Sequence, residues 1–401
     1  MFASLQSIYH RLLDSVDTKH HRFLYSQFNL SSRLTGLIGP RGAGKTTLLL
    51  QIIKQQFSAQ SAFYFSADHI YFSNNTLYAL VEELHLHEGI NIFFIDEIHR
   101  YEHWNQELKN LYDGFPSIRI VFSGSSSLDI VNSGYDLSRR AKMYTLPGLS
   151  FREYLNFYCD QHIEAITYED LMENHQAYDA LLASIPKIKG HFQNYLKQGY
   201  YPFYEEDPIY YHEKLLTVID KTIYEDIANF YHLKTENLQY FKKILYFLAS
   251  IPPGNISIHN IAKNILLDDK TVANYLQQLK TTGLVQLIFS TGSGNTLLRR
   301  PDKVFISNTN LHYAITKNIN HPIELGTTRE LFFIQSLTGA GKTLYYSQIG
   351  DYQIENIIFE IGGKNKTMQQ LKDQENSFLV KDDILVSRRR EIPLILFGFL
   401  Y

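Results

Sequence analysis

A glycine-rich octapeptide near the N-terminus combines the residue types and the spacing of a phosphate-binding loop. It consists of Gly39, Pro40, Arg41, Gly42, Ala43, Gly44, Lys45 and Thr46, and so fits the pattern G-x-x-x-x-G-K-[ST]. In that pattern backbone N–H groups surround a polyphosphate, the lysine contacts the β- and γ-phosphates, and the hydroxyl binds Mg²⁺. The pattern predicts that residues 39–46, together with Thr47, bind ATP and that Thr46 is a ligand of Mg²⁺.

Apolar segments on either side of this loop indicate how it is held. Residues 34–38 are apolar enough for a buried strand, and residues 47–53 open a helix. A strand, a glycine turn and a helix N-terminus in this order direct backbone N–H groups toward an anion. The surrounding pattern therefore supports nucleotide binding by the loop.

Two adjacent carboxylates, Asp96 and Glu97, directly follow an apolar and partly β-branched run at residues 92–95. Such a run is typical of a buried parallel strand, which places the acids at its C-terminal end. There Asp96 is predicted to hold Mg²⁺, directly or through water, and Glu97 to orient and polarise an attacking water. A small-molecule kinase does not need the second acid, so the pair favours hydrolysis of the nucleotide.

The composition is that of a globular protein with several domains. The chain has 401 residues, of which 44% are hydrophobic and 20% charged. This suits two or three domains and excludes an intrinsically disordered chain. The formal net charge of −3 does not indicate a nucleic-acid binder, so any contact with DNA would come from a local basic patch.

The sequence also predicts the cellular compartment. Cys159 is the only cysteine, which excludes an internal disulfide and suits a reducing cytoplasm. Residues 1–6 lack the basic and apolar regions of a signal peptide. No apolar run approaches the ~20 residues of a membrane span, and the run at 392–401 is predicted to be a buried final strand. We therefore expect a cytoplasmic protein with no membrane partner.

The periodicity of apolar residues predicts an α/β protein that begins with a P-loop NTPase parallel sheet. Residues 1–150 are expected to form this domain together with an N-terminal helix, and residues 151–252 a helical lid or connector. The expected parallel strands are residues 34–38, 62–66, 92–95, 118–125 and 143–146. A winged helix-turn-helix at 253–308 and a second, small α/β unit at 309–401 complete the chain.

The winged helix is predicted from two helices and a hairpin. The helices are expected at 258–266 and 271–282, and the strands at 284–289 and 296–300. The second helix exposes amides but few cations, so DNA is one candidate partner and a protein is another. The basic residues that would either contact phosphates or form a solvated face are Lys280, Arg299, Arg300 and Lys303.

Several motifs together resemble the prokaryotic AAA-type ATPases of the archaeal-ATPase and signal-transducing branch of the AAA+ superfamily. They are the glycine loop, Ile95–Arg100, Phe122–Ser127 and Leu149–Tyr154. The segment Phe359–Lys366 resembles the C-terminal domain of these proteins, which has unknown function and a restriction-endonuclease-like core. The resemblance covers nearly the whole chain and implies such a nuclease-like fold for residues 309–401.

The resemblance implies two further roles in hydrolysis. One of Ser123, Ser125 and Ser126, at the tip of a strand, would be the polar sensor of the γ-phosphate. Arg140, or its neighbour Arg139, would act as a finger on the γ-phosphate of a neighbouring subunit, or the two would form a solvated basic pair. A homo-oligomer is therefore a candidate assembly.

A restriction-endonuclease-like core uses an Asp and a Glu to hold Mg²⁺ and a Lys to steady the attacking water. The matching candidates are Asp351, Glu360 and Lys364, with Glu330 on the preceding helix. Lys364 lies two residues later than the usual Glu-x-Lys spacing, so an inactive scaffold is favoured over an active nuclease. Asp351 and Glu360 are nevertheless the candidates for a second metal site.

Taken together, the motifs predict a Mg²⁺-dependent ATPase that serves as a switch or motor for its C-terminal region. ATP and Mg²⁺ are the expected cofactors. Two alternatives are an ATP-regulated DNA nuclease and a non-enzymatic switch in which the bound nucleotide controls an assembly. DNA, another protein and a second copy of the chain are the candidate partners.

Overall fold

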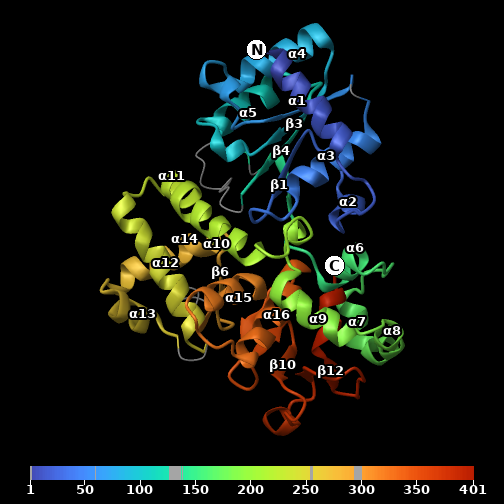
Figure 1. The fold of residues 1–401 in the computed structure, drawn as a ribbon, viewed down its shortest axis with the longest axis vertical. Helices are drawn as coiled ribbons and strands as arrows, with labels where there is room; N and C mark the ends of the chain where they lie inside the picture. The colour runs from blue at the N-terminus through green and yellow to red at the C-terminus, as the bar shows by residue number, and fades with distance from the viewer. Residues whose placement is uncertain (1, 59, 126–136, 138, 253–255, 293–299) are drawn as a thin grey trace. The chain divides into compact units, whose positions relative to one another are not determined.

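The structure is a computed structural model, and it describes residues 2–58, 60–125, 137, 139–252, 256–292 and 300–401. Contacts divide the chain into two units, Met1–Pro147 and Gly148–Tyr401. Figure 1 shows the course of the chain through each of them.

The first unit is a five-stranded parallel sheet with helices on its faces. The strands are β1 (Leu34–Ile38), β2 (Ala62–Ser66), β3 (Ile92–Asp96), β4 (Arg119–Gly124) and β5 (Ala141–Thr145). The helices are α1 (Phe2–Ser15), α2 (Leu24–Gln27), α3 (Lys45–Gln56), α4 (Leu77–Glu88) and α5 (Trp104–Gly114). The predicted P-loop NTPase sheet is thereby confirmed.

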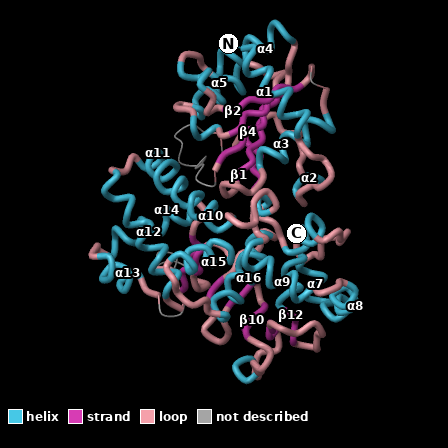
Figure 2. The backbone as a smooth tube through the Cα atoms, viewed as in Figure 1, coloured by secondary structure: helices cyan, strands magenta, loops and turns pink. Residues whose placement is uncertain are grey.

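The strand order places the acidic strand close to the phosphate loop. The order is β2-β3-β4-β1-β5, so β4 lies between β1 and β3. Figure 2 shows the strands in magenta. Right-handed crossovers put α3 on one face of the sheet and both α4 and α5 on the other. In agreement, α1 packs against α3, and α4 packs against α5 (Figure 1). The C-terminal ends of all strands therefore meet at one edge.

Aromatic and aliphatic side chains fill both faces of this sheet. Phe93, Phe94, Ile95 and Phe122 are completely buried. Burial on both faces explains why the strands are continuous apolar runs in the sequence rather than alternating ones. The N-terminal helix α1 is fixed to the sheet by Tyr9, whose hydroxyl donates to the carbonyl of Ala62 at 2.9 Å.

The second unit begins with a helical region. Its helices are α6 (Phe151–Tyr158), α7 (Tyr168–Asn174), α8 (Asp179–Ser184), α9 (Ile188–Gln198), α10 (Tyr211–Lys221), α11 (Ala228–Tyr231) and α12 (Thr235–Ser250). Residues Thr222–Ile227 form a π-helical turn between α10 and α11.

The motif Leu149–Tyr154 has a structural role at the start of α6. Ser150 and Glu153 form a capping box, in which each side chain accepts a hydrogen bond from the other residue's backbone N–H. Arg152 in the same turn donates to the carbonyl oxygen of Tyr401 at 2.8 Å. The motif thus ties α6 to the last residue of the chain.

Two helices and a hairpin follow the helical region. They are α13 (Ile258–Ile265), α14 (Asp269–Thr281) and the antiparallel strands β6 (Val285–Ile288) and β7 (Lys303–Ile306). The side chain of Asp268 caps α14 by accepting the N–H of Thr271 at 2.9 Å. The strand that pairs with β6 lies at 303–306, not at 296–300 as we expected, and residues 296–299 lie outside the described residues.

The chain ends in a mixed sheet with helices. Its elements are α15 (Thr309–Asn318), α16 (Leu325–Gly339), β8 (Tyr345–Tyr346), β9 (Tyr352–Ile354), β10 (Ile357–Gly362), β11 (Ser377–Lys381) and β12 (Glu391–Pro393). The strand order is β12-β11-β10-β9-β8, with parallel pairs from β10 to β12 and antiparallel pairs from β8 to β10. The small C-terminal α/β unit is therefore confirmed.

The final apolar run differs from the strand that we expected. The strand β12 ends at Pro393, and residues Leu394–Phe399 form a 3₁₀ helix that is buried throughout. Proline has no N–H group to donate to a sheet. A short buried apolar run also has no periodicity that separates strand from helix. The predicted burial is right, and the predicted strand is wrong beyond Pro393.

Candidate nucleotide-binding and hydrolytic site

The glycine loop joins β1 to α3 and needs glycine at three of its positions. Gly42 and Gly44 have φ of 84° and 91°, in the left-handed region that other residues avoid. A Cβ atom on Gly39 would lie 2.2 Å from the carbonyl oxygen of Leu146. The glycines of the motif therefore bring the backbone into a turn that wraps the N-terminus of α3.

The loop lysine is buried and bonded to the loop itself. The ammonium group of Lys45 donates to the carbonyl oxygens of Gly39 at 2.9 Å and Pro40 at 3.1 Å. Only 6% of the residue is exposed. An ammonium held in this position can exchange the two carbonyls for phosphate oxygens with little movement of its stem.

Asp96 at the end of β3 receives hydrogen bonds on both carboxylate oxygens. Its Oδ2 accepts from the hydroxyls of Thr46 at 2.5 Å and Tyr64 at 2.9 Å. Its Oδ1 accepts from the hydroxyl of Ser123 and from the N–H of Glu97, the latter at 3.0 Å. Burial and the charge of Asp96 raise the pKa of Tyr64, which therefore remains a donor. The sheet thus brings together residues from α3, β2, β3 and β4.

These groups suit Mg²⁺, which prefers oxygen ligands and usually keeps several waters beside one or two carboxylates. The hydroxyl of Thr46 and the carboxylate of Asp96 already lie side by side, at 2.5 Å. Among the described residues, no cluster of three or more His, Cys, Asp and Glu side chains could hold a metal. The pair of Thr46 and Asp96 fits a metal ion whose other ligands are phosphates and water.

Glu97 has an unusual backbone conformation. It lies in the left-handed region with φ of 50°, between β3 and the short 3₁₀ segment Ile98–Arg100. Its N–H is bonded to Asp96 and lies 3.3 Å from the hydroxyl of Ser123. Such strain in a residue other than glycine is concentrated at functional sites. Its side chain is 29% exposed, so the carboxylate can reach a water molecule.

The two described sensor candidates lie at the end of β4, and both are buried. Ser123 is fully buried and donates to Asp96. Ser125 is 7% exposed, and its backbone N–H donates to Nδ1 of His99 at 3.4 Å. Ser126, the third candidate, lies outside the described residues. Of the two that are described, Ser123 is the one whose hydroxyl joins the Asp96 cluster.

Arg140, the finger candidate, contacts its own unit in this structure. Its Nε lies 3.4 Å from a carboxylate oxygen of Asp113 in α5. Its guanidinium carbon lies 5.7 Å from the centre of the Tyr112 ring. Arg139 is more exposed than Arg140. Asp113 and Tyr112 of α5 thus hold Arg140 next to the start of β5.

Sequence reasoning missed Arg22, which braces the phosphate loop. Its guanidinium donates to the carbonyl of Ala43 at 2.5 Å and to that of Pro147 at 2.8 Å. Only 5% of Arg22 is exposed. No local pattern marks this residue, because its partners lie 21 and 125 positions away in the sequence.

The second unit brings the C-terminal acids together and adds lysines that we did not expect. Lys303 of β7 donates to Glu330 at 2.7 Å and lies 3.4 Å from Asp351. Burial alone would lower the pKa of Lys303, but attraction to these two carboxylates outweighs it and the pKa is raised. Oδ2 of Asp351 accepts the N–H of Ile361 at 2.8 Å. Both oxygens of Asp351 therefore have partners within the protein.

Glu360 is paired with Lys366 rather than with Lys364. The ammonium of Lys366 lies 2.5 Å from Oε1 of Glu360, whereas Lys364 is exposed. Burial raises the pKa of Glu360, and the bond to Lys366 partly offsets this effect. The charge of Asp351 also raises it. The lysine that we selected by spacing is thus replaced by Lys303 and Lys366.

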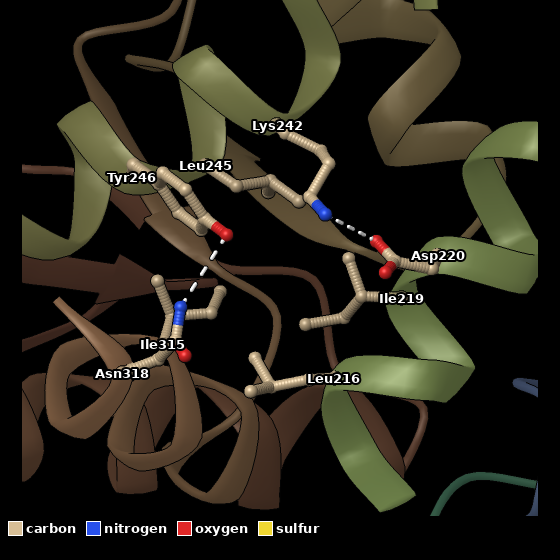
Figure 3. Close-up of a pocket in the computed structure, with 8 residues that line it drawn as sticks. All are labelled: Leu216, Ile219, Asp220, Lys242, Leu245, Tyr246, Ile315 and Asn318. Atoms are coloured by element: carbon tan, nitrogen blue, oxygen red, sulfur yellow. Dashed lines mark hydrogen bonds and ion pairs between the residues drawn. The ribbon is translucent and has the colours of Figure 1, made fainter. Parts of the chain in front are cut away.

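A separate pocket of about 300 Å³ lies among α10, α12 and α15 in the second unit (Figure 3). Within it Lys242 and Asp220 form an ion pair of 2.8 Å. The amide of Asn318 donates to the hydroxyl of Tyr246 at 3.4 Å. The polar groups of this pocket satisfy one another, which is typical of a structural pocket rather than a reactive one.

Two family models match parts of the chain. Residues 31–155 match the family model described as an AAA domain, and this range contains the glycine loop, Asp96, Glu97 and Ser123. Residues 31–155 therefore form an AAA domain. Residues 189–321 match a second model, described as a domain of unknown function (DUF8612). The predicted resemblance to AAA-type proteins is therefore confirmed for this range, and the branch of that superfamily stays a prediction.

Similar proteins add little about function. An uncharacterized protein of Methanocaldococcus jannaschii, MJ1637, is 28% identical over 379 residues, which are 86% of this chain and 79% of that protein. The structure of the Aeropyrum pernix Orc1 protein in complex with DNA aligns over 78% of this chain and 92% of that one, at 12% identity and a TM-score of 0.31. A katanin structure aligns over 73% and 85%, at 15% identity and a TM-score of 0.28. TM-scores this low leave the fold and the site to rest on the family match and the geometry above.

None of the helices in the described part of the chain is both long enough and apolar enough to cross a membrane.

Proposed function

We propose that the chain is a Mg²⁺-dependent ATPase in which hydrolysis controls how the C-terminal region engages a partner. The observation that carries this proposal is the cluster around Asp96. Thr46 of the phosphate loop and Ser123 of the neighbouring strand both bond to its carboxylate, and Glu97 follows it directly. A phosphate loop, a metal ligand, a polar sensor and a base thus converge at one edge of a parallel sheet.

The residues divide the work of hydrolysis as follows. Backbone N–H groups of residues 39–47 and the ammonium of Lys45 bind the phosphates. Thr46 and Asp96 hold Mg²⁺, which neutralises charge that develops on the phosphate oxygens. Glu97 orients the attacking water, and Ser123 contacts the γ-phosphate. The contacts of Thr46, Ser123 and Glu97 with Asp96 support these roles.

Arg140 completes the site from a neighbouring copy in this proposal. The residue leaves Asp113 and Tyr112 when a second copy binds, and its guanidinium then stabilises charge on the γ-phosphate. An Arg140→Ala variant is expected to bind ATP normally and to lose most of its turnover. The wild-type chain should have a larger mass with ATP than with ADP in light scattering, and an equal mass in both states would count against this role.

The C-terminal region is the part that hydrolysis acts on. We propose that α13, α14 and the β6–β7 hairpin form a winged helix that contacts DNA or a protein. We also propose a structural role for the acids of the mixed sheet, because Asp351 and Glu360 are already bonded to lysines and to backbone N–H. A cytoplasmic location belongs to the same proposal and rests on the single cysteine, Cys159.

Replacement of Glu97 by glutamine tests the hydrolytic role. The amide keeps the shape of the side chain but cannot act as a base, so turnover should fall by at least ~100-fold while the affinity for ATP is unchanged. Glu102→Gln is a matched control, since Glu102 lies on the same segment with its side chain 89% exposed. Turnover near that of the wild type in Glu97→Gln would show that another group activates the water.

A further inference from the structure

His99 lies between the proposed base and the end of the sensor strand. Its Nε2 is 3.5 Å from Oε2 of Glu97, and its side chain is only 10% exposed. Its Nδ1 accepts the backbone N–H of Ser125 at 3.4 Å. One imidazole ring therefore joins Glu97, which follows β3, to Ser125, which follows β4.

The contact with Ser125 determines which ring nitrogen carries the proton. A backbone N–H can only donate, so Nδ1 of His99 must be the acceptor. In the neutral ring the proton is then on Nε2, which is the nitrogen that faces Glu97. Nε2 and Oε2 of Glu97 lie 3.5 Å apart, which is an electrostatic contact and not a hydrogen bond.

The carboxylate of Glu97 needs a partner that restricts its orientation, because the side chain is long and partly exposed. A glutamate loses substantial rotamer freedom when it is fixed, and a catalytic group must be held within roughly 0.5 Å of its working position. The left-handed backbone of Glu97 fixes the Cα atom but not the carboxylate. A buried ring next to the carboxylate limits the orientations that remain.

We propose that His99 is a positioning residue that holds the carboxylate of Glu97 and couples it to the end of β4. This inference rests on the proposed function, because it assigns His99 to the same hydrolytic step. In this arrangement Ser125 and His99 connect the end of the strand that carries Ser123 to the carboxylate of Glu97.

Two substitutions of His99 separate positioning from simple packing. His99→Phe fills a similar space but offers neither nitrogen. It is expected to lower kcat by about 10- to 100-fold, the range known for partners that orient a metal ligand, with the KM for ATP within about twofold of the wild type. In His99→Gln the amide NH₂ stands near the place of Nε2 and should recover a large part of kcat.

The control and the readouts make the outcomes distinct. His103→Ala lies on the same segment with its side chain 73% exposed and should behave as the wild type. Melting temperature and ATP affinity are measured for every variant. The inference is overturned if His99→Phe keeps the wild-type kcat, or if His99→Gln is no more active than His99→Phe. A wild-type chain that binds ATP without hydrolysing it would instead overturn the proposed function, and this inference with it.

Discussion

Asp96 is the residue on which the proposed chemistry of the site depends. Its Oδ2 accepts two hydroxyl groups at once, from Thr46 and from Tyr64. The two donors differ, because Thr46 belongs to the phosphate loop and would turn its oxygen toward a metal, whereas Tyr64 is buried in the sheet. Tyr64 therefore fixes the carboxylate, as partners of a metal ligand generally do.

This difference predicts the effect of Tyr64→Phe. Loss of the phenol should weaken Mg²⁺-dependent binding of ATP by about 10- to 100-fold and leave binding without Mg²⁺ unchanged. Calorimetry with and without EDTA measures both values. Tyr101→Phe is the control, since Tyr101 makes a similar bond to Glu107, at 2.9 Å, away from the site. Equal affinities in Tyr64→Phe and the wild type would show that Tyr64 does not orient the metal ligand.

At the scale of elements, the phosphate loop is held by a segment that precedes the sheet. Arg22 lies before α2 and bonds to the loop at Ala43 and to Pro147 at the end of the unit. Charged donors to backbone carbonyls are among the stronger hydrogen bonds in proteins. The loop is thus preorganised before a ligand arrives, which lowers the cost of ordering it on binding.

Arg22→Met should therefore lower the affinity for ATP by about tenfold, because an ordering cost of ~1.4 kcal/mol moves from folding to binding. Arg33→Met is the matched control. Arg33 also donates to backbone carbonyls, those of Tyr112 and Phe115, but it does not contact the loop. Calorimetric titration of both variants with ATP distinguishes them. An equal loss of affinity in the two would indicate general destabilisation instead of loop preorganisation.

The sequence predicted the elements whose pattern is local. Residues 39–46 carry their own spacing, and Asp96 and Glu97 end an apolar run, so both could be placed without a structure. His99, Arg22 and Lys303 could not, because each acts through partners brought near by the chain's topology. The prediction of the final strand was wrong for another reason. Residues 394–399 form a short buried apolar run, and such a run has no periodicity that distinguishes a strand from a helix.

At the scale of the whole molecule, the matched regions do not coincide with the two units. The AAA domain match ends at residue 155, inside α6, and the match of unknown function runs from 189 to 321, from α9 to just past α15. The second range includes connector helices from α9 to α12 and also the β6–β7 hairpin. We therefore propose that the connector and the winged helix respond to hydrolysis as one module.

Stability of the second unit should depend on pH through His312. This residue of α15 is 4% exposed, and burial, with a smaller effect of His321, lowers its pKa to about 4. The unfolded chain has the ordinary value of 6.5 and binds the proton more readily. The part of the free energy of unfolding that depends on His312 is therefore at its full value above pH 6.5 and decreases as the pH falls toward 4. The decrease between pH 7 and pH 5 is about 2 kcal/mol.

Urea unfolding at pH 7 and pH 5 measures this contribution. His312→Phe should lose about 2 kcal/mol less stability than the wild type over that interval. His259→Ala, with a side chain that is 71% exposed in the wild type, should behave as the wild type. An identical pH dependence in His312→Phe and the wild type would show that His312 is not held neutral in the folded unit.

We propose that the cluster around Asp96 hydrolyses ATP with Mg²⁺. The most direct measurement is the release of inorganic phosphate from ATP by the purified full chain, with Mg²⁺ and after chelation with EDTA. We predict steady release over many turnovers in Mg²⁺ and none above background in EDTA. Stoichiometric binding of ATP with no release of phosphate in Mg²⁺, at any protein concentration, would contradict the account.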